Sequence, residues 1–237
     1  MRGDMRFFVG TSAFSEPKWK GSFYPKTLPA KEMLKYYAER FNAVEINSSY
    51  YRMPRASNLK PWLADVPEGF RFTFKAPQAI THFKRLKDAE VPTETFIQET
   101  AVLGAQRGPL LFGLPPNYKK DVGRLRSFLQ QLPSGLRVAF EFRHASWFDD
   151  ETFACLRSSG CALCVNDEDK SPWTDLVHTA DWGYLRLRRE AYTDKGLAAW
   201  VEKLRAQKWR EAYVFFKHEE TGTGPKLAAR FLKLCGD

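Results

Sequence analysis

The sequence predicts an α/β protein that folds as a single closed (β/α)8 barrel of the TIM type, formed by residues 1–237. Eight short apolar runs, typical of buried parallel strands, recur along the chain with starts 22 to 39 residues apart. Most of the intervening segments carry apolar residues at spacings of three and four, which indicates amphipathic helices. Eight such units in a chain of this length fit a closed barrel better than an open doubly wound sheet, which usually has fewer strands.

The expected elements alternate from the first strand to the last helix. We expect strands at residues 7–10, 43–46, 71–75, 110–112, 138–142, 162–165, 184–187 and 212–216. Helical spacing predicts helices at residues 30–40, 93–106, 121–131, 149–158, 196–207 and 225–234. The segment after the sixth strand, residues 167–181, is expected to be mostly loop.

Composition limits the class of protein. With 43% hydrophobic and 27% charged residues, the chain has the composition of an ordinary soluble globular protein. No apolar run approaches the ~18 residues of a membrane span, so we expect a cytoplasmic protein without membrane contact. No G-x-G-x-x-G turn follows the first strand, and the four histidines form no clear ligand set with carboxylates. We therefore expect neither a cofactor nor a metal.

The four cysteines are too few for a secreted disulfide scaffold, so reduced thiols are expected. Cys161 and Cys164 form a C-x-x-C, but they lie in a strand-like run, where positions three apart face opposite sides. We interpret them as buried apolar side chains rather than as a redox pair or zinc ligands.

Polar and charged side chains end seven of the eight expected strands, where β/α barrels carry their chemistry. Because side chains in a strand repeat every two residues, Glu141 and Arg143 share one face, as do Arg186 and Arg188. Burying unpaired charges is strongly unfavourable, so these groups form either a mutually paired network or a functional site. The strand-end residues are Ser12, Glu45, Asn47, Thr73, Lys75, Glu141, Arg143, Asn166, Arg186, Arg188, Lys217 and His218.

An excess of positive charge among these residues predicts a small anionic ligand, phosphorylated or carboxylated, because guanidinium groups bind both anions in a bidentate manner. Within the set, Glu45 with Lys75 and Glu141 with Arg186 are possible ion pairs. In a metal-independent enzyme, a hydrolase or a lyase, either glutamate would act as general acid or base. The predicted catalytic residues are Glu141, Glu45 and Lys75. The predicted substrate-binding residues are Arg143, Arg186, Arg188, Asn47, His82, Asn166, Lys217, Ser12, Tyr51 and Trp147. Of these, Tyr51 and Trp147 are expected to form pocket walls.

The segment from Thr221 to Pro225, which reads Thr-Gly-Thr-Gly-Pro, follows the last strand and precedes the last helix. Two interpretations are open. The glycines and the helix N-terminus would suit a phosphate, as in many β/α barrels. A plain turn with Thr223 as the helix cap and Pro225 near the first helical position explains the same residues and is favoured.

Two other classes of function remain. A net charge of +9 and 15% aromatic residues are compatible with a nucleic-acid binding or processing protein. Its stacking residues would include Trp19, Trp147, Trp173 and Trp182. The third class is a non-catalytic binding or scaffold barrel. Two carboxylates would also fit a glycosidase, but only at suitable separations. Nothing in the sequence indicates the oligomeric state.

Several motifs also resemble a known family. They include Gly10-Thr11-Ser12, the run from Phe41 to Arg52 (Phe-Asn-Ala-Val-Glu-Ile-Asn-Ser-Ser-Tyr-Tyr-Arg), Leu114-Pro115-Pro116 and Glu141-Phe142-Arg143-His144. In order and spacing these resemble the YecE-like family, domain of unknown function family 72. The resemblance implies a β/α barrel and no established activity.

The chain departs from the pattern of that family near its C-terminal end. Lys217-His218 stands where the family typically has Asn-Asn, and residues 222–227 stand where it typically has Gly-His-Ala-Pro-x-Asn. Loss of that histidine and asparagine implies an altered substrate choice or a weakened activity.

Overall fold

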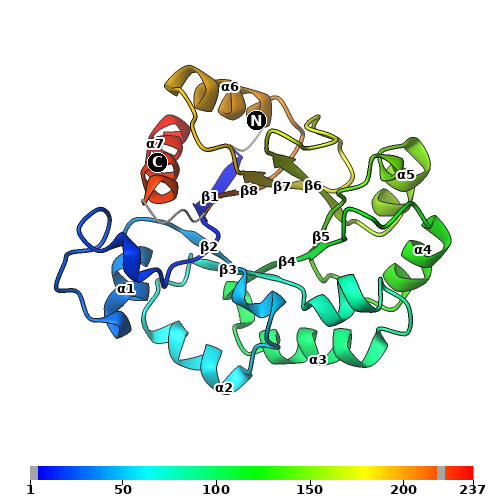
Figure 1. Ribbon diagram of the computed structural model, residues 1–237, viewed down its shortest axis with the longest axis horizontal. Coiled ribbons are helices and arrows are strands. Elements are labelled where there is room, and N and C mark those ends of the chain that lie inside the picture. Colours follow the sequence, from blue (N-terminus) through cyan, green and yellow to red (C-terminus); the bar gives the residue numbers. More distant parts are fainter. Residues whose placement is uncertain (1–4, 218–221, 237) are drawn as a thin grey trace.

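Eight parallel strands surround the centre of the molecule and helices cover their outside, as seen down the barrel in Figure 1. The computed structural model describes residues 5–217 and 222–236. The hydrogen-bonded strand order is β1-β8-β7-β6-β5-β4-β3-β2. The strands are β1 (Arg6–Thr11), β2 (Ala43–Ile46), β3 (Arg71–Lys75), β4 (Arg107–Gly113), β5 (Val138–Glu141), β6 (Ala162–Asp167), β7 (Trp182–Leu187) and β8 (Glu211–Phe216). The predicted TIM-type fold and all eight predicted strands are confirmed.

The helices follow the predicted order, with one addition. They are α1 (Met33–Ala38), α2 (Ala56–Leu59), α3 (Glu90–Ala101), α4 (Val122–Gln130), α5 (Asp150–Ser158), α6 (Asp194–Arg205) and α7 (Thr223–Cys235). The one-turn helix α2 was not expected. Asp121 and Asp149 cap α4 and α5 by accepting the backbone N–H groups of Arg124 and Thr152. Within the described residues, no helix is long and apolar enough to cross a bilayer.

Alternation along the strands divides the apolar residues into an inner and an outer set. Large rings of β1, β7 and β8 fill the barrel interior, where Phe8 stacks on Tyr213 with ring centroids 4.7 Å apart. Alanines of β2, β5 and β6 face these rings. Cys164 belongs to the inner set and Cys161 to the outer one, so the predicted opposite orientation is confirmed. All four cysteines are free.

Strands β1 and β2 close the barrel without a backbone ladder between them in the described part of the chain. The side chain of Asn42 takes the place of a ladder bond. Its Oδ1 accepts the N–H of Val9 at 2.7 Å, and its Nδ2 donates to the carbonyl of Phe7 at 2.8 Å. The side-chain amide of Asn42 thus offers one N–H donor and one C=O acceptor, as a peptide group in a ladder would.

The hydroxyl of Tyr37 makes a second bridge across this seam. It accepts the N–H of Thr11 at 2.7 Å and donates to the carbonyl of Ala43 at 3.1 Å. Gly10 lets the strands approach here, because a Cβ at this position would lie 1.8 Å from the oxygen of Ala43. The barrel is therefore closed by side chains at one seam and by ladders elsewhere.

Replacing Asn42 tests this closure. Asn42→Ala leaves the N–H of Val9 and the carbonyl of Phe7 without protein partners, so we expect the free energy of unfolding to fall by about 2 kcal/mol or more. Urea unfolding measures the change. The matched control is Asn58→Ala in the exposed part of α2, for which a change within about 0.5 kcal/mol is expected. Equal stability of the two variants would refute the structural role of Asn42.

Candidate functional site

Arg186 on β7 is buried at the C-terminal end of the barrel and binds two buried carboxylates. Its side chain is 2% exposed, and those of Glu45 and Glu141 are 0% exposed. Nη2 and Nε donate to Oε1 of Glu45 at 2.9 and 3.2 Å, and Nη1 donates to Oε2 of Glu141 at 2.9 Å. The expected pair of Glu141 with Arg186 is present. Glu45 pairs with Arg186 instead of Lys75, because the guanidinium reaches both sides of the barrel.

Tyr184 completes the shell around Glu45. Its hydroxyl donates to Oε2 of Glu45 at 2.6 Å and lies 3.1 Å from Oγ1 of Thr73. Burial, followed by the charge of Glu45, raises the pKa of Tyr184 well above its ordinary value, so the phenol stays a neutral donor. Tyr184 is not among the site residues predicted from the sequence. Its position two residues before Arg186, on the same strand face, was the signal that could have found it.

Arg143 lies at the edge of this network and reaches the cavity. Its Nε and Nη2 donate to Oε1 of Glu141 at 3.3 and 3.1 Å, and its side chain is 32% exposed. Burial alone would raise the pKa of Glu141, but Arg186, Arg143 and Lys75 outweigh it and hold the pKa well below the usual range. Glu141 is therefore an ionised acceptor, which opposes its predicted use as a general acid.

Lys75 ends β3 and faces the same cations. Its Nζ lies 4.4 Å from the ring centroid of Tyr50, and no described carboxylate lies within 4.0 Å of it. Burial, and then the charges of Arg186 and Arg143, lower the pKa of Lys75 to about 8. An amine of this kind can gain or lose a proton near neutral pH.

His82 lies behind Tyr50 rather than in the cavity lining. Its ring packs edge-on against Tyr50, with centroids 5.0 Å apart, and its Nδ1 is 3.0 Å from Oγ1 of Thr81. Burial, Lys75 and Arg143 lower the pKa of His82 to about 4, so the imidazole is neutral at neutral pH. It supports the ring of Tyr50 and adds no further positive charge.

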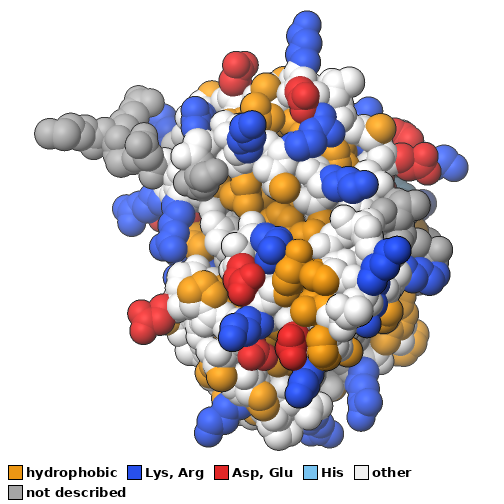
Figure 2. All heavy atoms as spheres, turned by 90° about the vertical axis from the view of Figure 1, so that its left-hand side faces the viewer, with side chains coloured by type: hydrophobic (Ala, Val, Ile, Leu, Met, Phe, Trp, Pro, Cys, Tyr) orange, Lys and Arg blue, Asp and Glu red, His pale blue; other side chains and the backbone are white. Residues whose placement is uncertain are grey.

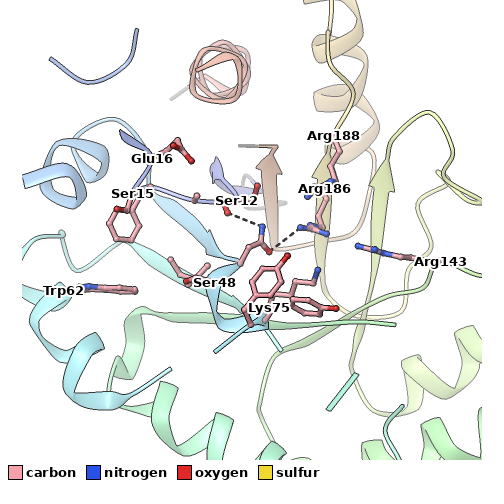
Figure 3. A pocket seen from close by; sticks show the side chains of 15 residues that line it. Ser12, Ser15, Glu16, Ser48, Trp62, Lys75, Arg143, Arg186 and Arg188 are labelled. Atoms are coloured by element: carbon pink, nitrogen blue, oxygen red, sulfur yellow. Dashed lines mark hydrogen bonds between the residues drawn. The ribbon is translucent and has the colours of Figure 1, made fainter. Parts of the chain in front are cut away.

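A cavity of about 710 Å³ opens above these residues, at the C-terminal ends of the strands (Figure 3). Its volume lies in the range of small-molecule sites. The expected residues Ser12, Asn47, Tyr51 and Arg188 line it together with Lys75, Arg143 and Arg186. The complete lining is Ser12, Ala13, Phe14, Ser15, Glu16, Ile46, Asn47, Ser48, Tyr50, Tyr51, Trp62, Lys75, Arg143, Arg186 and Arg188.

Other expected site residues lie elsewhere. Trp147 is 0% exposed, stacks on Phe142 and donates from its indole N–H to the carbonyl of Tyr118 at 2.8 Å, which corrects its expected place in a pocket wall. Asn166 is buried, donates to Oε1 of Glu168 at 2.7 Å and is not in the cavity lining. Lys217 is also absent from that lining. The expectation for His218 falls outside the described residues.

The turn before α7 differs from the favoured interpretation. Gly222 is the N-cap, with a left-handed φ of 72°, and no side chain caps the helix. Thr223 is the first helical residue rather than the cap, and Pro225 is the third. A Cβ at Gly222 would lie 2.5 Å from Oγ of Ser22, so both backbone angle and space favour glycine. Thr221, the start of the segment, is outside the described residues.

Comparison with known proteins agrees with the fold and the motifs. The family model "Protein of unknown function DUF72" matches residues 8–237. The chain belongs to this family. UPF0759 protein YunF of Bacillus subtilis is 26% identical over 218 residues, which are 84% of this chain and 75% of YunF. UPF0759 protein YecE of Escherichia coli is 28% identical over 142 residues, which are 60% of this chain and 50% of YecE.

Solved structures of DUF72 proteins share the whole barrel. A protein from Thermotoga maritima superposes with a TM-score of 0.83 and 30% identity, covering 98% of this chain and 100% of the other. One from Enterococcus faecalis has a TM-score of 0.80 and 20% identity, covering 100% of both chains. A glycoside hydrolase, GH5_18 from Bifidobacterium longum, has a TM-score of 0.58 and 11% identity, covering 99% of this chain and 79% of the other. The last two similarities show the fold alone.

Removing Arg186 from this DUF72 chain tests the buried network. Arg186→Met leaves Glu45 and Glu141 buried without their shared cation, so we expect the free energy of unfolding at neutral pH to fall by about 3–5 kcal/mol. In the native chain the pKa of Glu141 is below its unfolded value, so the pair stabilises the fold above the unfolded pKa, and this contribution is lost as pH falls.

The pH dependence separates this network from simple loss of packing. Without Arg186, burying a glutamate side chain costs less free energy when its carboxyl group is protonated. The loss of unfolding free energy in the variant should therefore shrink as the pH falls from about 7 to about 4. Urea unfolding at each pH measures it. The triple variant Glu45→Gln, Glu141→Gln, Arg186→Met should recover part of the loss. A deficit that is constant with pH would contradict the ion-pair account.

Proposed function

We propose that this chain is a metal-independent enzyme that binds a small phosphorylated or carboxylated molecule in the cavity at the C-terminal end of its barrel. One observation carries the proposal. Lys75, Arg143, Arg186 and Arg188 face the cavity, whereas the network beneath it contains two carboxylates, and Arg186 is engaged by both of them. The lining also contains one carboxylate, Glu16, on the other side of the cavity, so the surplus of positive charge around Arg186 favours an anionic ligand.

Three cations are placed to receive that anion. Arg143 is oriented by Glu141 while part of its side chain stays accessible. Arg188 is 18% exposed, and its Nε is 3.9 Å from the nearest oxygen of Glu168, a distance too long for a firm hydrogen bond. Lys75 adds a charge that depends on pH. The anion would thus bind beside Arg186 rather than on it, which revises the role predicted for that residue.

The same geometry favours Lys75 as the group that transfers a proton. A pKa of about 8 allows the amine to donate or accept a proton near neutral pH. Glu141 remains ionised, and Glu45 is enclosed by Tyr184 and Arg186. The proposed reaction is therefore a proton transfer by Lys75 next to a bound anion, in a hydrolase or a lyase.

The alternatives are less favoured. A glycosidase of the two-carboxylate type needs a proton donor with a raised pKa, whereas the pKa of Glu141 is lowered. For nucleic acids, Trp19, Trp147 and Trp182 are buried and cannot stack on bases, and the partly exposed Trp173 already stacks on Phe148. Figure 2 shows Lys and Arg side chains spread among acidic and apolar ones on the face that it displays. A non-catalytic binding barrel would retain the ligand without forming product.

The charge of Lys75 gives the anion site a pH dependence. Sulfate is a suitable probe, because it stays fully ionised between about pH 6 and pH 10, where lysine titrates. Lys75 is protonated below its pKa of about 8, so sulfate affinity should fall as pH rises through about 8. Calorimetry should show this fall in the native chain and in the control Lys208→Met, which changes an exposed residue. Persistence of the same fall in Lys75→Met would exclude Lys75 as its source.

Arg143 provides a second, charge-based test. Arg143→Met removes a guanidinium from the cavity and should weaken sulfate binding about tenfold, the change expected for a lost charge-assisted contact. The matched control is Arg210→Met, which changes a side chain that is 85% exposed at the opposite end of the barrel. Equal affinities of the two variants would place the anion elsewhere. Product formation by the native chain that is lost in the Lys75→Met variant would distinguish an enzyme from a binding barrel.

A further inference from the structure

The cavity lining has two unlike sides. The cations are Lys75 at the end of β3, Arg143 two residues after β5, Arg186 in β7 and Arg188 directly after β7. The aromatic residues come instead from the segments that follow β1 and β2, namely Phe14, Tyr50, Tyr51 and Trp62. Figure 3 shows Trp62 on the opposite side of the cavity from Arg143, Arg186 and Arg188, with Lys75 between them. A ligand that fills this space meets rings at one end and cations at the other.

We propose that the ligand of this site is a heteroaromatic anion of nucleotide size, whose planar ring binds against Trp62, Phe14 and Tyr51 while its phosphate or carboxylate binds the cations. This inference rests on the proposed anion site and adds the class of molecule that the site accepts. The cavity volume of about 710 Å³ leaves far more room than a phosphate or a carboxylate group needs.

The ring side is a built surface. Trp62, in the short helix Lys60–Ala64, packs against Phe72 of β3 with centroids 5.4 Å apart. Phe14 lies edge-on to Trp62, also at 5.4 Å, and its backbone carbonyl accepts the hydroxyl of Tyr24. Trp62 and Phe14 are therefore held by the core but remain partly exposed in the cavity.

Tyr51 adds an exposed ring to the cavity lining. It is 77% exposed and packs edge-on against Tyr50, whose ring in turn contacts Nζ of Lys75. These contacts place two aromatic rings of the lining next to the cation of Lys75. Stacking of a planar ligand on such side chains should contribute about as much binding energy as stacking of a nucleic-acid base on a protein aromatic ring.

Polar groups on the ring side favour a ring with nitrogen or other polar atoms over a plain hydrocarbon. Glu16 and Ser48 line the cavity and lie on the same side as Trp62 in Figure 3. A carboxylate and a hydroxyl can accept hydrogen bonds from ring N–H or amino groups. A negative group here would also repel the phosphate or carboxylate, so it favours one orientation of the ligand over the reverse.

The experiment compares ligands that differ in the ring alone. Adenosine and cytidine 5′-monophosphates are the ring-bearing probes, a pyridine carboxylate tests the carboxylate source, and glycerol phosphate and sulfate lack a ring. Calorimetry on the full chain should give an affinity for at least one ring-bearing anion about tenfold above that for glycerol phosphate. Equal affinities for glycerol phosphate and all ring-bearing anions would overturn the inference.

Variants locate the ring. The ratio of nucleotide to sulfate affinity should fall several-fold in Trp62→Leu and in Tyr51→Ala. The matched control is Phe83→Ala, because Phe83 is 74% exposed but is not in the cavity lining. A ratio that is unchanged in Trp62→Leu and Tyr51→Ala, or that falls equally in Phe83→Ala, would overturn the inference.

The outcomes for the two proposals are distinguishable. Sulfate binding that depends on Arg143, without any gain from a ring, would leave the anion site standing and refute the heteroaromatic ligand. Failure of both sulfate and the nucleotides to bind would refute both. Nucleotide binding that is unaffected by Arg143→Met would refute the joint arrangement of ring and anion.

Discussion

The ion pairs of Arg186 with two buried glutamates are the constraint on which the mouth of this barrel depends. One guanidinium joins β7 to β2 and to β5, so it connects strands that are not neighbours in the sheet. Both carboxylates are fully buried, and their charges are tolerated because Arg186, Arg143 and Tyr184 satisfy them. Since Arg186 is engaged in this way, the anion of the proposed function would bind the other cations of the lining rather than Arg186.

The same network continues into the seam that closes the barrel. Asn47 donates to the carbonyl of Ser12 at 3.1 Å, across the gap between β1 and β2, and accepts from Nη2 of Arg186 at 3.4 Å. Asn42 bridges the same two strands nearer their other ends. Side-chain amides thus replace backbone ladder bonds at the one place where β1 and β2 meet, and Asn47 links that closure to the charged site.

The sequence was sufficient for the strands and for the gathering of charged side chains at one end of the barrel, but not for the pairing of those side chains. Period-two alternation placed Glu141 and Arg186 correctly because a strand imposes the face of each residue, and Arg143, just beyond β5, still reaches Glu141. The partner of Glu45 was predicted wrongly, since alternation does not reveal which side chain reaches across the barrel. Tyr184 was missed because only strand-end polar residues were considered, and Trp147 was misplaced because exposure depends on tertiary packing.

The two sides of the cavity offer a physical reason for combining a rigid aromatic surface with a titratable lysine. An anion held near Lys75 favours the protonated amine, so ligand binding and the protonation of Lys75 strengthen each other. In the proposed complex, contacts made by the distant ring of the ligand would supply binding energy that does not depend on this proton. Those contacts would hold the proposed ligand while Lys75 changes its charge, as a proton transfer at the anionic end of the ligand would require.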